Sequence, residues 1–530
     1  MSLTNPAKTE NPASNTNAGR ELNELISGQP EWFISEDGRG PVEVNRTEFD
    51  FSVAHGRLIF SCWTEQGSRA WRITAWNWSG DKLMLQASRR MGAELSTIAL
   101  VPRASAKALV ASIAAARQAR CERLAHLVAQ TLVCDDFGEN HILKSEPPAK
   151  IERAVLSPGM RRDQPGRYAR IILRLPRERI ALAATVAQSD PRNVDSLFSS
   201  ALLWFTRVQS STKRPDITRL LMVVERNVLE AARQRQVLLR DSLRQQIELF
   251  EIDDDWTRVE ATSPWERKYL WRKRLSRFPP VHDDEPGDRV KQIVAEAPGA
   301  IDVVSARHGQ TLRFHGMPFA RVRRVMERDR VWFGIEGSRR RSLDEHHQRD
   351  WTKLLRDLQT YRSESCRDRR HWFYRAAGEA WLESILRRDI SKLDPGLIIA
   401  PLHAQFRTSH GGPTGARPID LLALRHDGRL AVIELKVNED REHVFQGIDY
   451  WRRVEAHRRR GHISAAKLFG EREISDESPL VYLVAPALRF HPSFATLAKT
   501  IAPDIEIYRF DINEDWRAGV RVVRRDRVNP

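Results

Sequence analysis

Residues 417–437 read RPIDLLALRHDGRLAVIELKV, and this stretch decides the fold of the C-terminal part of the chain. Two apolar runs, Ile419–Leu424 and Leu430–Val437, flank His426-Asp427-Gly428-Arg429, and this pattern predicts a β-hairpin. Asp-Gly is a strong turn signal, because glycine adopts the left-handed conformation that closes a three-residue loop. We therefore expect two antiparallel strands joined by a tight turn.

The register of this hairpin decides which side chains meet. With a three-residue loop at His426–Gly428, Asp420 lies directly opposite Glu434, with Cβ atoms roughly 5 Å apart. A two-residue turn would shift this pairing by one position, and a β-bulge could restore it. Lys436 shares a strand face with Glu434, because side chains alternate along a strand.

Two facing carboxylates repel each other unless a positive charge lies between them. A hard divalent cation prefers oxygen ligands and would meet this need, with the amine of Lys436 beside it. The alternative is a half-exposed edge strand whose charges only discourage aggregation. The pairing of Asp420 with Glu434 favours the metal site.

The order of these motifs resembles a known family. A helical glutamate, then I-D at 419–420, I-E-L-K at 433–436 and Q-x-x-x-Y at 446–450 resemble the PD-(D/E)xK nuclease superfamily. The hairpin wording is similar to the NucS-like endonuclease domain and, more distantly, to archaeal Holliday-junction resolvases. The resemblance covers about residues 370–515. It implies a restriction-endonuclease-like core, a mixed sheet flanked by helices, that cleaves DNA with Mg²⁺ or Mn²⁺.

The resemblance also implies roles for residues of the hairpin. Asp420 and Glu434 would be metal ligands, and the carbonyl of Leu435 would complete the protein ligands. Lys436 would orient the attacking water or stabilise the charge that develops on the phosphate. Arg417, just before the first strand, is a candidate phosphate contact.

A helix over residues 372–388 is predicted to supply the glutamate of the motif. In the resembled family this glutamate precedes a leucine by three residues, as Glu379 precedes Leu382. Glu383 is the alternative, and both could be ordinary surface residues. The expected apolar stripe of this helix consists of Phe373, Ala377, Trp381 and Ile385.

A second helix is predicted over residues 441–459. Gln446 and Tyr450 are four residues apart and share a face. By resemblance they would order the site or hold a substrate phosphate, and otherwise they are surface polar residues. Arg453 belongs to a basic end of this helix that suits phosphate contacts.

Composition points to a nucleic-acid partner. The 530-residue chain has 86 lysines and arginines against 70 acidic residues, a net charge of +16, which favours a polyanion such as DNA. No apolar run approaches the ~18 residues of a membrane span, so we expect no membrane partner. The four cysteines are widely spaced, without C-x-x-C, which argues against a disulfide framework or zinc site and suits a cytoplasmic protein.

The chain is expected to be an α/β protein of several parts. They are a disordered tail at 1–29, a β-rich domain with a long helix at 30–150, an α/β domain at 151–262, a basic β module with a helical connector at 263–368, and the nuclease domain at 369–530. Four tryptophans of the second part either fill the core of a small barrel or stack on bases: Trp63, Trp71, Trp76 and Trp78.

The third part resembles the last one. Residues 165–260 repeat the strand and helix order of the C-terminal domain, and IELFEIDDDW at 247–256 is similar to IEIYRFDINEDW at 505–516. In the first copy Ala181–Val186 replaces I-E-L-K, with no carboxylate or lysine. We therefore interpret it as a degenerate nuclease-like copy, the alternative being chance similarity between two α/β layers.

The predicted function is metal-dependent endonucleolytic cleavage of DNA, in repair or in defence against foreign DNA. The alternative is a catalytically silent nucleic-acid-binding scaffold with a vestigial nuclease fold. The sequence leaves open whether the chain acts alone or as a homodimer, and whether the substrate is DNA or RNA.

Overall fold

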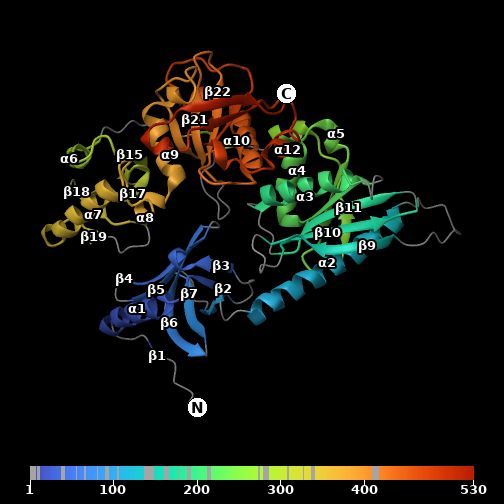
Figure 1. Ribbon diagram of the computed structural model, residues 1–530, viewed down its shortest axis with the longest axis horizontal. Helices are drawn as coiled ribbons and strands as arrows, with labels where there is room; N and C mark the ends of the chain where they lie inside the picture. Colours follow the sequence, from blue (N-terminus) through green and yellow to red (C-terminus); the bar gives the residue numbers. More distant parts are fainter. Residues whose placement is uncertain are drawn as a thin grey trace.

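The protein is a mixed α/β molecule with several sheets. The computed structural model, shown in Figure 1, describes residues 7–8, 12–36, 42–54, 57–64, 67–79, 81–89, 95–103, 107–135, 149–159, 166–176, 178–187, 193–211, 217–272, 275–278, 286–306, 309–325, 328–335, 341–408 and 417–530. Among these residues, no helix combines the length and the apolar character needed to cross a lipid bilayer.

The N-terminal part is an antiparallel sheet in the order β3-β2-β8-β7-β6-β5-β4, with β1 paired to β6. Its strands are β1 (Ala7–Lys8), β2 (Glu31–Glu36), β3 (Val42–Asn45), β4 (Phe49–Ala54), β5 (Arg57–Thr64), β6 (Gly67–Ser79), β7 (Lys82–Arg89) and β8 (Leu95–Pro102). Trp71 is buried in its core and Trp76 and Trp78 pack against that core, which confirms the packing interpretation for these three residues. The side chain of Trp63 lies outside the described residues.

The expectation of a disordered tail at 1–29 is wrong for residues 12–27. They form helix α1 (Pro12–Ser27), which packs on β4 and β5. Leu22 and Ile26 are four residues apart on one face of this helix, and both are fully buried against the sheet. The segment is polar overall, and its few apolar side chains lie on one narrow face, so composition alone did not predict the helix.

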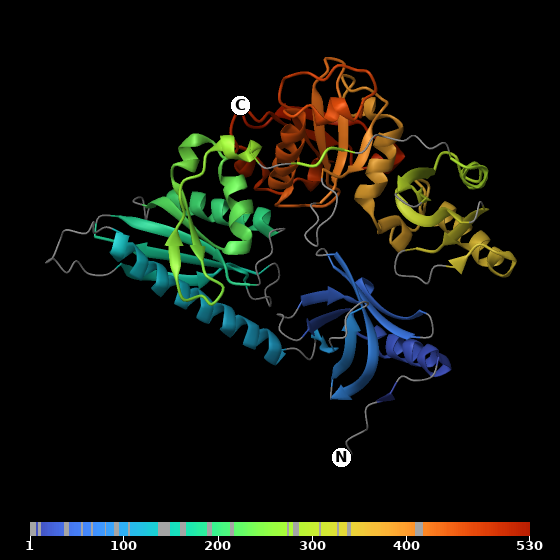
Figure 2. The same ribbon diagram turned by 180° about the vertical axis from the view of Figure 1, so that it is seen from behind.

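The long helix predicted for the N-terminal domain belongs to the next unit. Helix α2 (Lys107–Asp135) buries Cys121, Leu124 and Val128 against a second sheet rather than against the first. The boundary near residue 150 is therefore wrong, because the helix shares its core with the strands that follow it. Figure 2 shows α2 lying along the face of that second sheet.

The second sheet has the order β14-β13-β12-β11-β10-β9. Its strands are β9 (Lys150–Leu156), β10 (Tyr168–Arg174), β11 (Arg179–Thr185), β12 (Ile217–Glu225), β13 (Ile247–Ile252) and β14 (Val259–Ala261). The helices of this unit are α3 (Val194–Gln209), α4 (Arg226–Gln236) and α5 (Asp241–Arg244). Helix α2 covers one face of the sheet, and α3 and α4 cover the other.

The middle part is a small antiparallel module, as expected. Its strands are β15 (Ile301–Ala306), β16 (Gly309–Phe314), β17 (Met317–Val325), β18 (Arg328–Phe333) and β19 (Arg341–Ser342). Helices α6 (Asp288–Ala295) and α7 (Gln348–Tyr361) pack on this sheet. The connector α7 is thus part of the module's core.

The single helix predicted at 372–388 is broken. The structure has α8 (Trp372–Arg375) and α9 (Gly378–Arg388), separated by Ala377 in the left-handed conformation at φ 47°. The fully buried guanidinium of Arg362 causes the break, because it takes the carbonyls of Phe373 and Ala376 at 2.8 and 2.7 Å, which a continuous helix would use internally. The expected stripe is therefore divided, with Phe373 in the middle module and Trp381 in the C-terminal core.

The C-terminal sheet has the order β20-β21-β22-β23-β24-β25. Its strands are β20 (His403–Phe406), β21 (Ile419–Leu424), β22 (Leu430–Leu435), β23 (Leu480–Pro486), β24 (Ile507–Ile512) and β25 (Val522–Arg527). Its remaining helices are α10 (His443–Arg458), α11 (His462–Ala465) and α12 (Phe494–Ala498). Helix α9 packs on one face, and α10 packs on the other.

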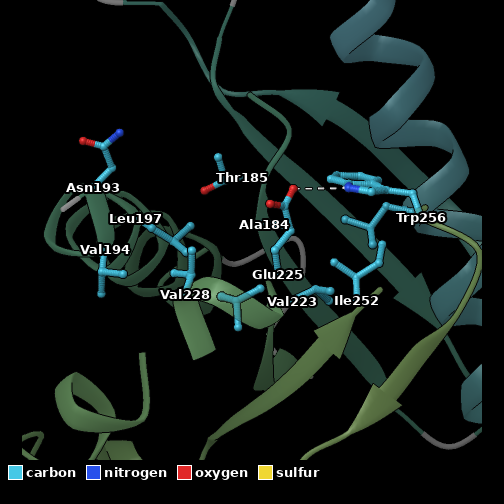
Figure 3. Close-up of a pocket in the computed structure, with 12 residues that line it drawn as sticks. Ala184, Thr185, Asn193, Val194, Leu197, Val223, Glu225, Val228, Ile252 and Trp256 are labelled. Atoms are coloured by element: carbon cyan, nitrogen blue, oxygen red, sulfur yellow. Dashed lines mark hydrogen bonds between the residues drawn. The ribbon is translucent and has the colours of Figure 1, made fainter. Parts of the chain in front are cut away.

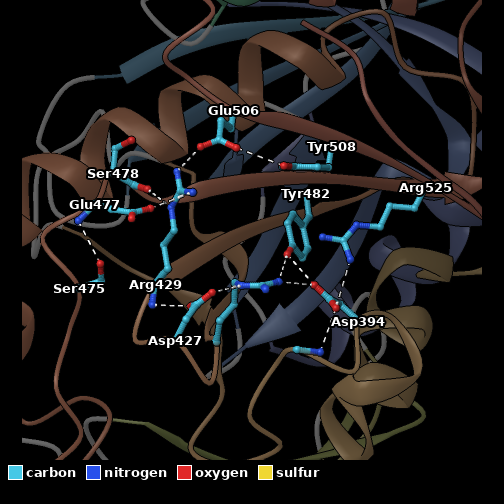
Figure 4. A network of polar contacts seen from close by, with 12 residues as sticks. Asp394, Asp427, Arg429, Ser475, Glu477, Ser478, Tyr482, Glu506, Tyr508 and Arg525 are labelled. Carbon is cyan, nitrogen blue, oxygen red and sulfur yellow. Dashed lines mark hydrogen bonds and ion pairs between the residues drawn. The ribbon is translucent and has the colours of Figure 1, made fainter. Parts of the chain in front are cut away.

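A polar network fixes the turn end of the hairpin formed by β21 and β22 (Figure 4). Arg429 donates to Glu506 at 2.6 Å and to the Ser478 carbonyl at 2.7 Å. Nearby, Asp394 accepts from the Tyr482 hydroxyl at 2.6 Å and pairs with Arg525 at 3.3 Å. The hairpin is thus anchored at the end opposite to Asp420 and Glu434.

The two six-stranded sheets share one topology, as the internal repeat predicts. In each, the first three strands are antiparallel, the next two steps are parallel, and the last step is antiparallel. Corresponding strands start alike, because Leu220 N donates to the Gln246 carbonyl and Val481 N donates to the Glu506 carbonyl. This register aligns IELFEIDDDW at 247–256 with IYRFDINEDW at 507–516 without a gap.

The two units dock through corresponding surfaces, and α3 and α4 face the C-terminal unit in Figures 1 and 2. Phe198 of α3 contacts Phe445 of α10 with ring centroids 5.8 Å apart, inside one apolar core shared by both units. After α4 and α12, Leu239 bridges Ile501, flanked by hydrogen bonds from Arg240 N to the Thr500 carbonyl and from Ala502 N to the Leu238 carbonyl. In each bond, the residue after the bridge in one unit donates to the residue before the bridge in the other unit. The interface therefore has an approximate two-fold axis.

Candidate active site

The hairpin has the register predicted from its turn. Leu421 pairs with Ile433 and Leu424 pairs with Leu430, which places Asp420 opposite Glu434 at the next step of the ladder. Gly428 has φ 79°, the left-handed conformation that the loop requires. Asp420 Oδ2 accepts a hydrogen bond of 2.9 Å from the backbone N–H of Leu435, and this bond holds the carboxylate against the second strand.

Glu434 is the most enclosed of the predicted site residues, with 1% of its surface exposed. Its Oε1 accepts from Lys436 Nζ at 2.8 Å. Its Oε2 is buried, no N–H of the described residues donates to it, and its polar neighbour is the Asp420 carboxyl, near enough for the two groups to share a proton. A buried carboxylate oxygen to which no N–H donates is costly, so this atom marks a position where a cation or donor would be stabilising.

The charges around Lys436 are unbalanced. Its ammonium pairs with Glu434 and lies 3.6 Å from Asp440 Oδ2, and the charges of Glu379 and Asp420 also raise its pKa. Burial and then the charge of Asp420 raise the pKa of Glu434 to about 8, although Lys436 opposes the shift. Burial also raises the pKa of Asp420 to about 6. One ammonium thus serves several acidic groups.

The structure brings both candidate helix glutamates to this region. Glu379, in the first turn of α9, is near enough to Lys436 and Glu434 for both charges to act on its pKa, which burial raises. Gly378 allows this approach, because a Cβ there would lie 2.9 Å from Val437 Cγ2. Glu379 acts on the lysine directly, whereas Glu383 reaches Asp420 only through another residue.

Gln405 of β20, which the sequence analysis missed, connects Glu383 to Asp420. Its amide nitrogen donates to Glu383 Oε2 at 2.7 Å and contacts Asp420 Oδ1 at 3.4 Å. Gln405 also has a left-handed backbone, φ 49°, which is uncommon for a residue other than glycine and is frequent at functional sites. No local sequence pattern marks it, because its role depends on contacts with distant segments.

His443 is a second residue that the sequence analysis missed. It is buried at the start of α10, and burial lowers its pKa to about 3, so its ring is neutral. Its Nε2 lies 3.2 Å from the Glu434 carbonyl, which can only accept, and so Nε2 carries the hydrogen. This bond fixes the end of β22 that carries the acidic side chain.

The helix residues of the Q-x-x-x-Y element are buried rather than on the surface. Gln446 contacts Glu442 Oε2 at 3.5 Å. Tyr450 lies close to the carboxylate pair, because the charges of Glu434 and Asp420 add to burial in raising its pKa. Both residues therefore lie behind the site, where they can order it.

The two predicted phosphate-binding arginines have different environments. Arg453 is only 8% exposed, its guanidinium stacks on Tyr450 at 4.6 Å, and it donates to Thr408 Oγ1 at 3.2 Å. Arg453 Nη2 is buried without a hydrogen-bond acceptor among the described residues, so the role of Arg453 as a phosphate contact stays a prediction. Arg417 has a side chain that is 36% exposed, 4.0 Å from Glu442 Oε2, and stays a prediction.

Comparisons of the chain with protein-family models, with curated proteins and with solved structures gave no match. The interpretation of the site therefore depends on its chemistry. Among the described residues, no group of three or more histidine, cysteine, aspartate or glutamate side chains is close enough to hold a metal ion. The pair formed by Asp420 and Glu434 nevertheless suits Mg²⁺, which often binds through one or two carboxylates plus waters and substrate phosphates.

The unit built on the second sheet, β9–β14, is called here the N-terminal α/β unit. It lacks these groups, as expected. Ala183 pairs with Met222 as Glu434 pairs with Leu483, and the antiparallel partner of Ala183 is Arg170. A methyl group and a guanidinium thus replace the two carboxylates. At the carboxyl ends of β11 and β12 this unit has a pocket whose lining is mainly apolar (Figure 3). Glu225 is the one carboxylate among its described lining residues, and it accepts from Trp256 Nε1 at 3.2 Å.

Glu434→Gln should remove a pH dependence of stability. Carboxyls in an unfolded chain ionise near pH 4, whereas Asp420 and Glu434 titrate near 6 and 8, so between about pH 4 and pH 8 the folded state holds more protons. The free energy of unfolding contributed by the pair therefore falls as pH rises through this window. Calorimetric scans from pH 5 to 9 should show a smaller loss of Tm for the variant than for the wild type. Parallel curves of Tm against pH would contradict the raised pKa values of the pair.

Proposed function

We propose that the chain is a metal-dependent endonuclease that hydrolyses phosphodiester bonds in DNA. The observation that carries this proposal is the buried carboxyl pair of Glu434 and Asp420, where no N–H donates to Glu434 Oε2 and Lys436 lies alongside. The proposal includes a restriction-endonuclease-like core of the PD-(D/E)xK type. The mixed sheet β20–β25, with α9 on one face and α10 on the other, supports such a core.

Asp420, Glu434 and the carbonyl of Leu435 would hold Mg²⁺ or Mn²⁺, which when bound polarises the scissile phosphate and lowers the pKa of a water. Lys436, whose Nζ donates to Glu434 Oε1, would orient the attacking water or stabilise the phosphoryl oxygens that gain charge. Glu379 adds a negative charge beside Lys436, which strengthens the preference of the site for a cation.

The net charge of +16 supports a polyanionic substrate. The alternative function, a catalytically silent DNA-binding scaffold, has the same charge but predicts retention of DNA without turnover. The two are distinguished by product formation rather than by binding.

Supercoiled plasmid should be converted to nicked circles, because Arg170 and Ala183 replace, in the second sheet, the pair formed by Asp420 and Glu434. Plasmid is incubated with the protein and Mg²⁺ or Mn²⁺, and products are separated on agarose gels. EDTA should abolish the reaction. The nicked form should accumulate before the linear form at every protein concentration, whereas a homodimer with two sites would give linear product directly as concentration rises.

A panel of single-stranded, duplex, flapped and mismatched DNA substrates then identifies the structure that is cleaved. Binding without cleavage across this panel, with both metals, would support the scaffold and contradict the nuclease.

A further inference from the structure

Arg170 of β10 occupies, in the N-terminal α/β unit, the position that Asp420 has in the C-terminal unit. It pairs with Ala183, whereas Asp420 lies opposite Glu434 one step beyond the pair of Leu421 with Ile433. The substitution reverses the charge of the position, from a carboxylate to a guanidinium. A site that would attract a cation in one unit should therefore attract an anion in the other.

The described neighbours of Arg170 do not neutralise it. Its Nη2 lies 3.5 Å from the hydroxyl of Ser200, a long contact with a neutral group. Its Nε is buried and has no acceptor among the described residues. A half-buried guanidinium without an anion is costly, because desolvation disfavours the charge and leaves donors unsatisfied.

Three more arginines surround this position, and each is exposed. Burial and then the charges of Arg207, Arg441 and Arg153 lower the pKa of Arg170, and no carboxylate contributes to the shift. These three come from α3, from the segment between β22 and α10, and from β9. Four arginines from four segments are thus near enough for their charges to act on Arg170, which is half-buried while the other three are exposed.

The location of the cluster favours a phosphate group of a nucleic acid. Arg441 belongs to the short segment that also carries Lys436, and its carbonyl accepts from Ser199 Oγ of α3 at 3.3 Å, so this segment connects the cluster to the proposed catalytic residues. Guanidinium groups bind phosphate oxygens through paired hydrogen bonds, and several together can follow a backbone. A free phosphate would use the same donors but would not need a rim of exposed arginines.

We propose that Arg170, Arg153, Arg207 and Arg441 form a binding site for the phosphodiester backbone of a nucleic acid, and that the N-terminal α/β unit has exchanged metal chemistry for substrate retention. The identity of the ligand as the substrate backbone rests on the proposed function. The site itself does not, because binding requires no cleavage.

The test measures the affinity for a fluorescent DNA duplex in the Glu434→Gln background, so that cleavage does not interfere. Arg170→Gln should weaken binding about tenfold, the loss expected for a hydrogen-bonded contact with a charged group. The slope of log affinity against log salt should fall by about 1. Arg226→Gln is the matched control, because Arg226 lies in the same unit and its side chain is 83% exposed.

Arg207→Gln combined with Arg441→Gln changes only exposed side chains and should also weaken binding. This double variant tests the site even if Arg170→Gln disturbs folding. Inorganic phosphate is the second probe, in thermal-shift measurements. Stabilisation by phosphate that equals the stabilisation by duplex and depends on Arg170 would overturn the backbone assignment in favour of a free phosphate. Unchanged duplex affinity and salt slope in both variants would overturn the site.

The two proposals fail separately. If the wild-type protein cleaves no DNA but Arg170→Gln still weakens duplex binding, the nuclease proposal fails and the phosphate site stands. If the wild-type protein cleaves DNA but Arg170→Gln does not change the affinity, the phosphate site fails and the nuclease proposal stands.

Discussion

Glu434→Gln should reduce metal-dependent cleavage about 10³-fold while leaving DNA retention in a gel within about twofold of the wild type. Glutamine keeps the size of the side chain but removes its charge, and with it the repulsion from Asp420 that a cation would relieve. The rate is measured from initial nicking of supercoiled plasmid with saturating Mn²⁺. Lys436→Met should give a comparable loss, because it removes the ammonium that pairs with Glu434.

Glu471→Gln is the matched control for this experiment. Glu471 lies in the same unit and pairs with Lys467 at the surface, with its side chain 83% exposed. Its replacement should leave the rate unchanged. Full activity in both Glu434→Gln and Lys436→Met would place the chemistry elsewhere in the molecule, and equal losses in the control would indicate a general effect on folding.

Arg235→Met should destabilise the protein by about 3 to 5 kcal/mol, the usual cost of breaking a buried ion pair. The side chain of Arg235 is 7% exposed and bonds Asp195 Oδ1 of its own unit at 2.7 Å and, across the interface between the two α/β units, Asp449 Oδ1 at 2.7 Å. Arg452 still pairs with Asp449 at 2.7 Å, so the variant chiefly leaves Asp195 buried and uncompensated. The free energy of unfolding is measured by urea titration.

Two further variants separate the cost of an unpaired charge from the loss of packing. Arg235→Met combined with Asp195→Asn should recover most of the stability, because the second change removes the orphaned charge. Arg219→Met is the control, since Arg219 pairs with Glu178 and Glu248 while 34% exposed and should contribute at most about 1 kcal/mol. Equal destabilisation by Arg219→Met and Arg235→Met would contradict the role given to burial.

The hairpin was predictable from sequence because its determinants are local. An Asp-Gly turn and two apolar runs fix the register within about twenty residues, and the register alone places Asp420 opposite Glu434. The repeated order of strands and helices was predictable for the same reason. What the hairpin could not indicate is the depth of the site, because the burial of Glu434 depends on α9 and α10.

The errors share a physical cause, which is contact between distant segments. Arg362 breaks the helix predicted at 372–388 by capturing carbonyls that the local pattern assigns to helix bonds. Gln405 joins the site only because β20 pairs with β21. The burial of Arg453 against Tyr450 and Thr408 was likewise not predictable from the basic end of its helix. Local patterns do not encode such partners.

The docking of the two α/β units has a consequence for the protein at low abundance. Phe198, Phe445 and the bridge between Leu239 and Ile501 join surfaces that separate subunits would have to find by diffusion. Here one chain carries both partners, so docking is a unimolecular step. Dilution therefore does not separate the two α/β units, and the fraction of molecules with docked units does not depend on protein concentration.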